Sequence, residues 1–377
     1  MHLNHAQWAQ AVRGFDHGGL VLRSAVLDAP AAYLASLGGC LDRCSDLDPA
    51  FDHTDATNAP DVTQALLLFN THVDKQLQLG EVLRQRQKSL TQLLDSHSWH
   101  RQLAASTPAA KAMLLSESQP GARAFLAAVP GGRCCMEPAA FIAEVRLRMG
   151  LPDAVADTWC PRCDGILDAY SHHAAVCSAG GERTQRHNAL RDLVCSWAER
   201  AGLHPEKERP GLLLPQRPEE AKVARRRPAD IYLPCLDGTP TALDFAVTGL
   251  QRPESLPQAA QVPVSAAAAY AQVKCNHQHT AQLCADQGVR FLPLVSESTG
   301  AWDTAASRTL RVIASAVAAR EGQVGSSVYT VMLQECSVLL RSFRARAALR
   351  RRSELVTFSQ HPVRASAVLL ESVPDVT

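Results

Sequence analysis

Two acidic residues in the middle of the chain have the spacing of a metal-binding pair. Asp230 precedes a short apolar run, an Asp237-Gly238 dipeptide follows, and Asp244 interrupts the apolar run on the return. An Asp-Gly between two such runs is typical of a β-hairpin. If the loop is odd-numbered and centred on Asp237, Asp230 and Asp244 lie opposite each other, with Cβ atoms about 5 Å apart. Converging buried acids need a partner, and a divalent metal ion is the usual one.

A helix after the hairpin offers a cation for the same site. Residues 265–274 are typical of a helix that begins at Ser265, and Tyr270 and Lys274 are four residues apart, so they share one face. Phosphodiester hydrolysis needs carboxylates, a water and a cation that offsets the developing charge. Lys274 is the candidate for that cation. The alternative is an ordinary hairpin with two solvated aspartates and a surface lysine.

A cysteine and histidine motif further upstream indicates a second, structural metal. Cys160-Pro-Arg-Cys163 is followed after eight residues by His172 and after four more by Cys177. This is the spacing of a zinc knuckle, in which the first pair wraps the metal in a tight turn. The predicted zinc ligands are Cys160, Cys163, His172 and Cys177, with His173 as the competing imidazole. The alternative is a set of unrelated buried thiols beside a histidine.

Basic residues surround the start of the helix after this motif. An amphipathic helix begins near Thr184 and ends at Gly202, with Leu190, Leu193, Val194 and Trp197 on its apolar face. A basic helix start suits nucleic-acid phosphates, although a solvated helix end explains it equally well. The candidate nucleic-acid contacts are Arg183, Arg186, His187, Arg191, Arg225, Arg226 and Arg227.

The order of elements predicts an α/β protein with several segments. The hairpin, the helix at 265–274 and a buried strand near 288–295 form one α/β unit. The expected segments are a helical region at 1–110, a helical linker at 111–155, the zinc knuckle at 156–180, the sheet domain at 181–320 and a basic helix with a loose tail at 321–377. The six arginines between 341 and 352 suggest a solvated helix face, or alternatively a nucleic-acid contact.

The amino-acid composition restricts the class of protein but does not identify a binding partner. The 377 residues are 46% hydrophobic, which supports real cores, and the formal net charge of +1 says nothing about binding partners. Twelve cysteines without a secretory pattern predict reduced thiols rather than a disulfide framework. No apolar run is long enough to span a bilayer, so we expect no membrane association and an intracellular, nuclear location.

The motifs, taken in order, resemble the C-terminal region of non-LTR retrotransposon polyproteins that carry a restriction-like endonuclease. The shared order is a Cys-Cys-His-Cys knuckle, Arg-His-Asn opening a helix, Arg-Pro-x-Asp, an acid fourteen positions on, and Tyr-x3-Lys. Gly18-Gly-Leu-Val-Leu-Arg-Ser24 resembles the region just after the palm of their reverse transcriptase, and Gly288–Trp302 is similar to the strand and loop that close the nuclease domain. The likeness covers most of residues 15–320.

This resemblance implies a PD-(D/E)XK-type nuclease, with a central mixed sheet flanked by helices, that nicks one strand of target DNA to prime reverse transcription. The family acids fall on Asp230 and Asp244 and the family lysine on Lys274. The sequence departs from the general pattern at Ala246, where an Asp-x-Lys motif would place its lysine, and has Pro-Ala-Asp for Pro-Asp. Because no Tyr- or Phe-x-Asp-Asp motif is present, we expect a fragment without the polymerase active site.

The functional expectation is therefore a Mg²⁺-dependent DNA endonuclease with a structural Zn²⁺ and with DNA and element RNA as partners. Asp230 and Asp244 would bind Mg²⁺, and the knuckle and the basic helix start would hold DNA. One alternative is a zinc-dependent nucleic-acid-binding module with a decayed nuclease. Another is an interaction protein that uses its amphipathic helices alone.

Overall fold

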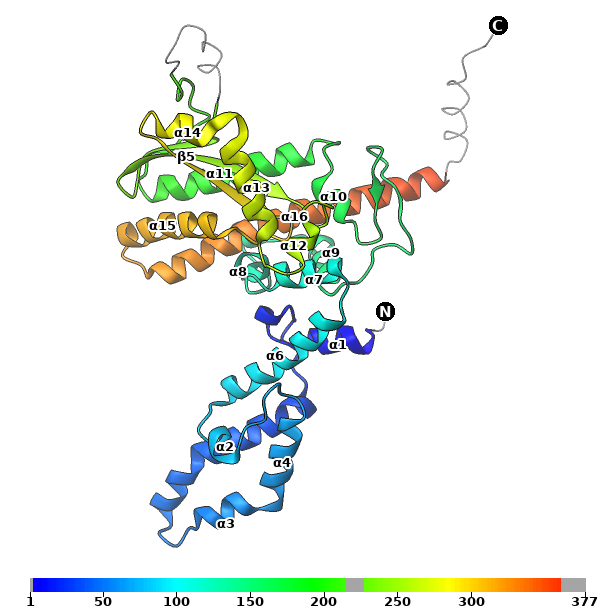
Figure 1. The fold of residues 1–377 in the computed structure, drawn as a ribbon, viewed down its shortest axis with the longest axis vertical. Helices are drawn as coiled ribbons and strands as arrows, with labels where there is room; N and C mark the ends of the chain where they lie inside the picture. Colours follow the sequence, from blue (N-terminus) through cyan, green and yellow to red (C-terminus); the bar gives the residue numbers. More distant parts are fainter. Residues whose placement is uncertain (1–2, 215–226, 361–377) are drawn as a thin grey trace. The chain divides into compact units, whose positions relative to one another are not determined.

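The protein folds as two compact units. The structure is a computed structural model that describes residues 3–214 and 227–360. The first unit is Met1–Thr107 and the second is Pro108–Thr377. The division falls close to the boundary expected near residue 110, and Figure 1 shows the helices of the first unit and the sheet of the second.

The first unit is a helical bundle. Its helices are α1 (His5–Ala11), α2 (Ala25–Leu47), α3 (His53–Asn58), α4 (Pro60–Asn70), α5 (Leu79–Val82) and α6 (Gln87–Ala105). The Ser24 side chain caps α2, and proline at the first position of α4 has the backbone angle that a helix start requires. Apolar side chains of α2, α4, α5 and α6 form the core. Its buried members are Ala31, Leu34, Val62, Ala65, Phe69, Val73, Val82, Leu90 and Leu94.

The Gly18–Ser24 stretch is a loop fastened to α6. Arg23 Nη1 donates to both carboxylate oxygens of Asp95, at 2.8 and 3.0 Å, and the Gly14 amide donates to Asp95 at 3.0 Å. A Cβ at Gly19 would lie 2.2 Å from the carbonyl oxygen of Arg13, so this position accepts only glycine. The Gly18–Ser24 stretch is therefore explained by structure: this loop lies in close contact with α1 and with α6.

The second unit is built on a four-stranded mixed sheet. Its strands are β3 (Glu206–Lys207), β4 (Ile231–Leu236), β5 (Thr239–Thr248) and β6 (Arg290–Glu297), in the order β3-β4-β5-β6. The first three strands are antiparallel, and β5 pairs with β6 in parallel. The parallel connection runs through α12 (Leu256–Ala259), α13 (Ser265–Asn276) and α14 (Thr280–Ala285). The predicted α/β class and hairpin are confirmed, and the strand expected at 288–295 extends to Glu297.

Helices cover both faces of this sheet. The helices α11 (Glu182–Arg200), α15 (Thr304–Glu321) and α16 (Gly325–Gln360) pack with Leu243 and Phe245 of β5 into the main core. Residues that alternate with these point to the opposite face, where Ala242 and Tyr232 pack with Cys284 of α14. Asp244 shares the face of Ala242, which turns it toward α13. No helix among the described residues has the length and apolar character needed to cross a membrane.

The register of the hairpin depends on a bulge. Asp237 and Gly238 have φ values of 53° and 75°, and Leu236 pairs with Thr239, so the turn contains only these two residues. A register shift between Leu233 and Leu236 adds one residue to β4, after which Leu233 pairs with Thr241 and Ile231 with Leu243. The paired ladder ends at Ile231 and Leu243, and one residue further the Asp230 amide donates to the Leu243 carbonyl at 2.9 Å. A two-residue turn and a bulge, instead of an odd-numbered loop, therefore bring Asp230 beside the strand that carries Asp244.

The segment expected as a linker is part of the folded second unit. It contains α7 (Pro108–Glu117), α8 (Pro120–Arg123) and α9 (Pro138–Arg148), and α8 and α9 pack against α16. Arg341 of α16 is fully buried and binds Glu117 of α7, with 2.9 Å between Nη1 and Oε1, and Glu144 of α9, at 3.0 Å. The 111–155 segment therefore belongs to the structure of this unit.

The basic C-terminal helix differs from its expected role. Arg341, Arg344 and Arg351 are buried, and Arg344 Nε donates to Glu144 at 3.0 Å. The expectation of a solvated arginine face is wrong for these three residues, because α16 crosses the interior of the unit and pairs them with acids and carbonyls from α7, α9 and the knuckle. Residues 361–377, expected as a loose tail, lie outside the described residues.

Candidate functional site

Three thiols and one imidazole converge in the knuckle. The strands β1 (Thr158–Trp159) and β2 (Ile166–Leu167) form a short hairpin whose loop contains Cys160 and Cys163. The short helix α10 (His172–Val176) supplies His173 and is followed by Cys177. The Sγ atom of Cys163 lies 3.1 Å from Nε2 of His173 and 3.5 Å from Sγ of Cys177, and all four ligand atoms lie within 4.8 Å of one another. We call these four residues the Cys3His group.

The imidazole in this group is His173 and not His172, which corrects the predicted ligand set. Successive helix residues point about 100° apart, so only one of two neighbouring histidines can face the thiols. Asp168 binds the other: its Oδ1 atom is 3.0 Å from Nδ1 of His172 and also accepts the His172 amide at 3.1 Å. The His173 ring packs over Gly165, where a Cβ would lie 2.5 Å from its Cε1 atom.

The donor set fits a zinc ion. Tetrahedral zinc has Zn–S bonds of about 2.3 Å, which places two sulfur ligands about 3.8 Å apart, close to the separations seen here. Soft thiolates with one imidazole favour zinc over hard cations such as Mg²⁺. Among the described residues, this is the only set of three or more His, Cys, Asp or Glu side chains that converges so closely. The group can therefore bind a metal ion such as zinc.

The structure also brings together Asp230, Asp244 and Lys274. The Nζ atom of Lys274 lies 2.9 Å from Oδ2 and 3.2 Å from Oδ1 of Asp244. Asp230 lies beside the same strand, because its Oδ2 atom accepts the amide of Phe245, the residue after Asp244, at 2.7 Å. The side chains of Asp230 and Asp244 are only 18% and 15% exposed, so the alternative of two solvated aspartates and a free surface lysine is wrong.

His187 of α11 joins these three side chains. We call Asp230, Asp244, Lys274 and His187 the acidic site. The Nε2 atom of His187 lies 3.0 Å from Oδ2 of Asp230, which also accepts the Phe245 amide at 2.7 Å. His187 was expected to contact nucleic acid, and its direct bond to Asp230 was not foreseen. The Arg-His-Asn stretch at the start of a helix was the available signal, but helix residues reveal no partner until the helix is placed against the sheet.

Burial and mutual repulsion give the two acids different properties. Burial raises the pKa of Asp244 to about 6, with Lys274 opposing the rise and Asp230 adding to it. Burial would also raise the pKa of Asp230, but hydrogen bonds from His187 and the Phe245 amide lower it below the usual value. The hydrogen bond to Asp230 in turn raises the pKa of His187. A cation between the two carboxylates would relieve the cost of burying both charges.

A small pocket opens between α11, β5 and α13 beside the acidic site. Its volume is about 110 Å³, and its polar lining consists of Arg183, Arg186, His187, Tyr270 and Lys274. Arg186 is 5% exposed, and its Nη1 atom donates to the Ala175 carbonyl of α10 at 2.7 Å, while its Nε atom has no hydrogen-bond partner among the described residues. Burial lowers the pKa of Arg186 to about 10. The pocket thus has the donors and the positive charge that suit an anion.

Arg191 and Arg227, also predicted as nucleic-acid contacts, do not line this pocket. Arg191 is engaged by Asp192 and Glu208, and Arg227 is paired with the same Glu208 at 3.1 Å. These ion pairs compensate the charge that was expected to face phosphate. Arg225 and Arg226 lie outside the residues that the structure describes.

Glu297, at the end of β6, was not among the predicted site residues. Its side chain is fully buried and accepts a hydrogen bond from Ser116 Oγ at 2.5 Å, while its Oε1 atom has no hydrogen-bond partner among the described residues. Burial raises the pKa of Glu297 to about 7. The hydrogen bond from Ser116 connects the end of β6 to α7. The sequence had placed Glu297 in a loop, which concealed this contact.

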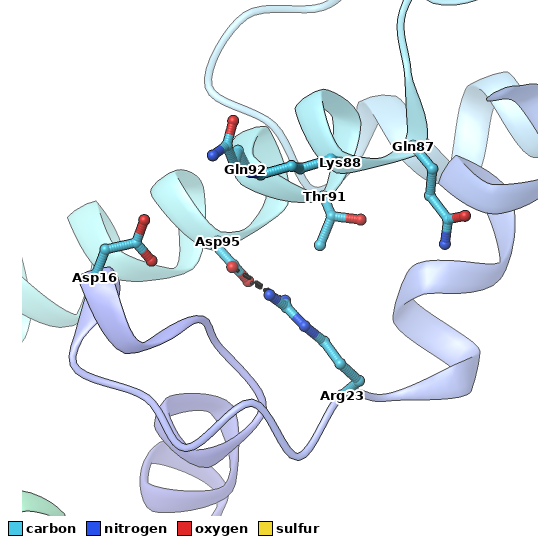
Figure 2. A pocket seen from close by; sticks show the side chains of 7 residues that line it. All are labelled: Asp16, Arg23, Gln87, Lys88, Thr91, Gln92 and Asp95. Atoms are coloured by element: carbon cyan, nitrogen blue, oxygen red, sulfur yellow. Dashed lines mark hydrogen bonds and ion pairs between the residues drawn. The ribbon is translucent and has the colours of Figure 1, made fainter. Parts of the chain in front are cut away.

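The first unit contains a larger, shallow pocket without predicted site residues. Figure 2 shows Arg23 reaching across it to Asp95, with Asp16, Lys88 and Gln92 around it. Its volume is about 390 Å³, and Arg23 and Asp95 in its lining already form an ion pair. It presents no group of converging metal ligands or nucleophiles among the described residues.

No protein-family model matches this sequence, and no curated protein matches it. Function is therefore inferred from the side chains of the Cys3His group, the acidic site and the pocket beside it.

Proposed function

We propose that this chain is a metal-dependent DNA endonuclease of the restriction-like kind, with a zinc-stabilised knuckle, related to the C-terminal part of non-LTR retrotransposon polyproteins. The observation that supports it most is the convergence of Asp230, Asp244 and Lys274. A bulged hairpin aligns the two acids, and α13 returns the lysine to them. Two carboxylates and one ammonium group rarely meet by chance at one largely buried place.

Each side chain of the acidic site has its own role in the proposed phosphodiester hydrolysis. Bound Mg²⁺ would supply Lewis acidity and lower the pKa of a water ligand. Asp230 and Asp244 would hold the ion, and His187 and the Phe245 amide fix the orientation of Asp230. The Lys274 ammonium group, which neutralises Asp244 in this structure, is placed to stabilise the negative charge that develops on the phosphate.

The adjoining pocket supports a phosphodiester substrate. Arg183, Arg186 and Tyr270 line it together with His187 and Lys274 of the acidic site. Phosphate contacts supply most of the affinity and position the strand, and guanidinium groups suit phosphate oxygens. The mixed sheet flanked by helices on both faces also accords with the PD-(D/E)XK architecture that the resemblance implies.

A plasmid-nicking assay tests the proposal. With Mg²⁺, the purified wild-type chain should convert supercoiled plasmid to the nicked form, and Asp230→Ala and Asp244→Ala should each slow nicking at least about 100-fold. DNA binding measured by mobility shift should persist in both variants. The control is Asp237→Asn in the exposed turn, which should nick like wild type. Equal cleavage by wild type and both alanine variants would contradict the assignment.

One observation favours a second candidate, a zinc-dependent nucleic-acid-binding module without nuclease activity. Trp159 and Ile166 pair across the knuckle hairpin, and their side chains are 70% and 57% exposed. Exposed aromatic side chains stack on unpaired bases. A zinc-dependent mobility shift with single strands that Trp159→Ala weakens, together with no Mg²⁺-dependent nicking, would select this function instead.

A further inference from the structure

The helix α16 places a buried arginine beside the Cys3His group. Ala347 and Ala348 of α16 pack with Cys160, Cys177 and Leu167 of the knuckle in one apolar cluster. Arg351, one helical turn later, is fully buried. An arginine is rarely buried without a partner for its charge, so its surroundings require an explanation.

The hydrogen bonds of Arg351 leave its charge without a matching carboxylate bond. Its Nη2 atom donates to the Ala179 carbonyl at 3.1 Å and its Nη1 atom to the Ala347 carbonyl at 3.0 Å. The Sγ atom of Cys177 lies 4.0 Å from the same Ala179 carbonyl oxygen, so the guanidinium group lies beside this thiol. Its Nε atom is buried and has no hydrogen-bond partner among the described residues.

The nearest acid, Glu182, has a closer partner. Glu182 Oε2 lies 3.6 Å from Nη2 of Arg351, whereas Glu182 Oε1 lies 3.0 Å from Nη1 of Arg350. Arg350 can therefore balance Glu182, which leaves one positive charge next to the thiols. Three thiolates and a neutral imidazole around a divalent ion carry a net charge of −1. A buried charge of that kind is costly unless an opposite charge lies close to it.

We propose that Arg351 is the counter-charge of the metal centre, so that α16 is an integral part of the zinc module. Its guanidinium group balances the net charge of the metal-bound Cys3His group and donates to the carbonyl of Ala179, two residues after Cys177. This assignment is independent of the nuclease activity, because it depends only on the Cys3His group and its surroundings.

Further contacts fasten α16 to the knuckle on either side of Arg351. Arg352 Nη2 donates to the Asp168 carbonyl at 2.6 Å, and Arg352 Nε donates to Ser171 Oγ at 3.2 Å. Glu354 pairs with Arg162, which lies between the first two cysteines. These bonds position the loops that flank the ligands, while Arg351 alone is buried against the sulfur atoms.

Metal titration of the full chain tests the proposal directly. Cobalt(II), followed by its thiolate absorption, and competition for zinc with a chromophoric chelator give the affinity of the centre. Arg351→Met retains most of the side-chain volume and should weaken metal binding about 10- to 100-fold, as loss of an outer partner does at other metal sites. The matched control is Arg346→Met on the same helix, where the side chain is 52% exposed and affinity should not change.

A thermal cycle separates the charge effect from a structural one. The metal-bound centre carries the net charge of −1 that Arg351 balances, so Arg351→Met should lower the melting temperature of the metal-loaded form more than that of the metal-free form. Arg351→Lys keeps the charge and should retain affinity within about threefold of wild type. Equal destabilisation of both forms by Arg351→Met would overturn the proposal. If the methionine variant does not fold, the lysine variant decides, and a loss beyond about threefold overturns it.

Discussion

Gly165 illustrates how a single hydrogen atom in place of a side chain shapes the metal centre. A Cβ at this position would lie 2.5 Å from Cε1 of His173 and 3.2 Å from both ring nitrogens. Gly165→Ala should therefore displace the imidazole and weaken cobalt(II) and zinc binding at least about 10-fold in the same titrations.

Gly131→Ala is the matched control for this prediction. Its backbone is extended, with φ of 172°, and no atom lies within 4 Å of the added methyl group. Metal affinity should equal that of wild type. Unchanged affinity in Gly165→Ala as well would show that His173 does not bind the metal in the orientation described.

We expect the buried Asp244 carboxylate to lower the folding stability of the metal-free protein, although the acidic site requires this residue. Because its pKa rises to about 6 on folding, the native state favours the protonated form. Its contribution to stability is thus fully present below the unfolded pKa, declines as the pH rises toward about 6, and stays low above that value. Asp244→Asn, which resembles the protonated acid, should raise the free energy of unfolding of metal-free protein by about 1–3 kcal/mol at pH 8.

Denaturant unfolding at pH 4.5 and pH 8, without divalent ions, measures this effect. The difference between Asp244→Asn and wild type should grow between the two pH values, while nicking by the variant is lost. Asp237→Asn in the exposed turn should change neither property. A destabilised Asp244→Asn variant at pH 8 would contradict the electrostatic account of this site.

For single residues, the sequence predicted which side chains form the two sites but predicted less of what surrounds each side chain. Alternating apolar residues around Asp237-Gly238 predicted that Asp230 and Asp244 would face each other, because register follows from turn position and pattern. His172 and His173 both satisfy the knuckle spacing, and only the position of Asp168 decides between them. The burial of Arg186 depends on a carbonyl in another element, which no local pattern contains.

Among the elements, α16 has the most unexpected role. Its arginines were expected on a solvated face, but Arg341 lies between Glu117, Glu144 and the ring of Phe125, which is 4.5 Å away. Removing one partner from a buried ion network leaves uncompensated charge. Arg341→Ala should therefore lower the free energy of unfolding by about 3–5 kcal/mol in chemical denaturation.

Arg346→Ala provides the comparison on the same helix. Arg346 is half exposed and lies 3.4 Å from Glu137, a pair of a kind that stabilises by less than about 1 kcal/mol. If both variants lose the same stability, the buried network does not contribute as the structure indicates.

The elements themselves were largely predictable, whereas their packing was not. Periodic apolar residues indicated a helix from about Thr184 to Gly202, found as α11, and small residues with Tyr270 and Lys274 indicated α13. Segment 111–155 was expected as a helical linker with a helix near Pro138–Met149; the helix is confirmed as α9, but it packs against α16. Burial of α16 could not be foreseen because its partners, Glu117 and Glu144, lie about 200 residues earlier in the chain.

For the whole molecule, the division into two compact units predicts separable stability. Phe69 is 1% exposed in the core of the first unit, and Phe69→Ala should destabilise that unit by about 3–5 kcal/mol. Cobalt(II) bound at the Cys3His group of the second unit should keep its absorption through the earlier transition, measured beside circular dichroism during denaturation.

Leu67→Ala is the control, since this leucine of the same helix is 64% exposed and its loss should change stability by less than about 1 kcal/mol. Simultaneous loss of the cobalt signal and of the helical signal in Phe69→Ala would show that the two units unfold as one.

The position of α16 in the chain also has a consequence for biosynthesis. This helix lines the main core, closes the buried arginine network and packs on the knuckle, yet nearly all of the second unit is translated before it. While the ribosome still holds these residues, the nascent sheet exposes an apolar face and the cysteines have no neighbouring guanidinium group. Completion of this unit and stable metal loading must therefore wait until α16 has left the ribosome, and a premature stop codon upstream of Arg341 would yield a product prone to aggregation or proteolysis.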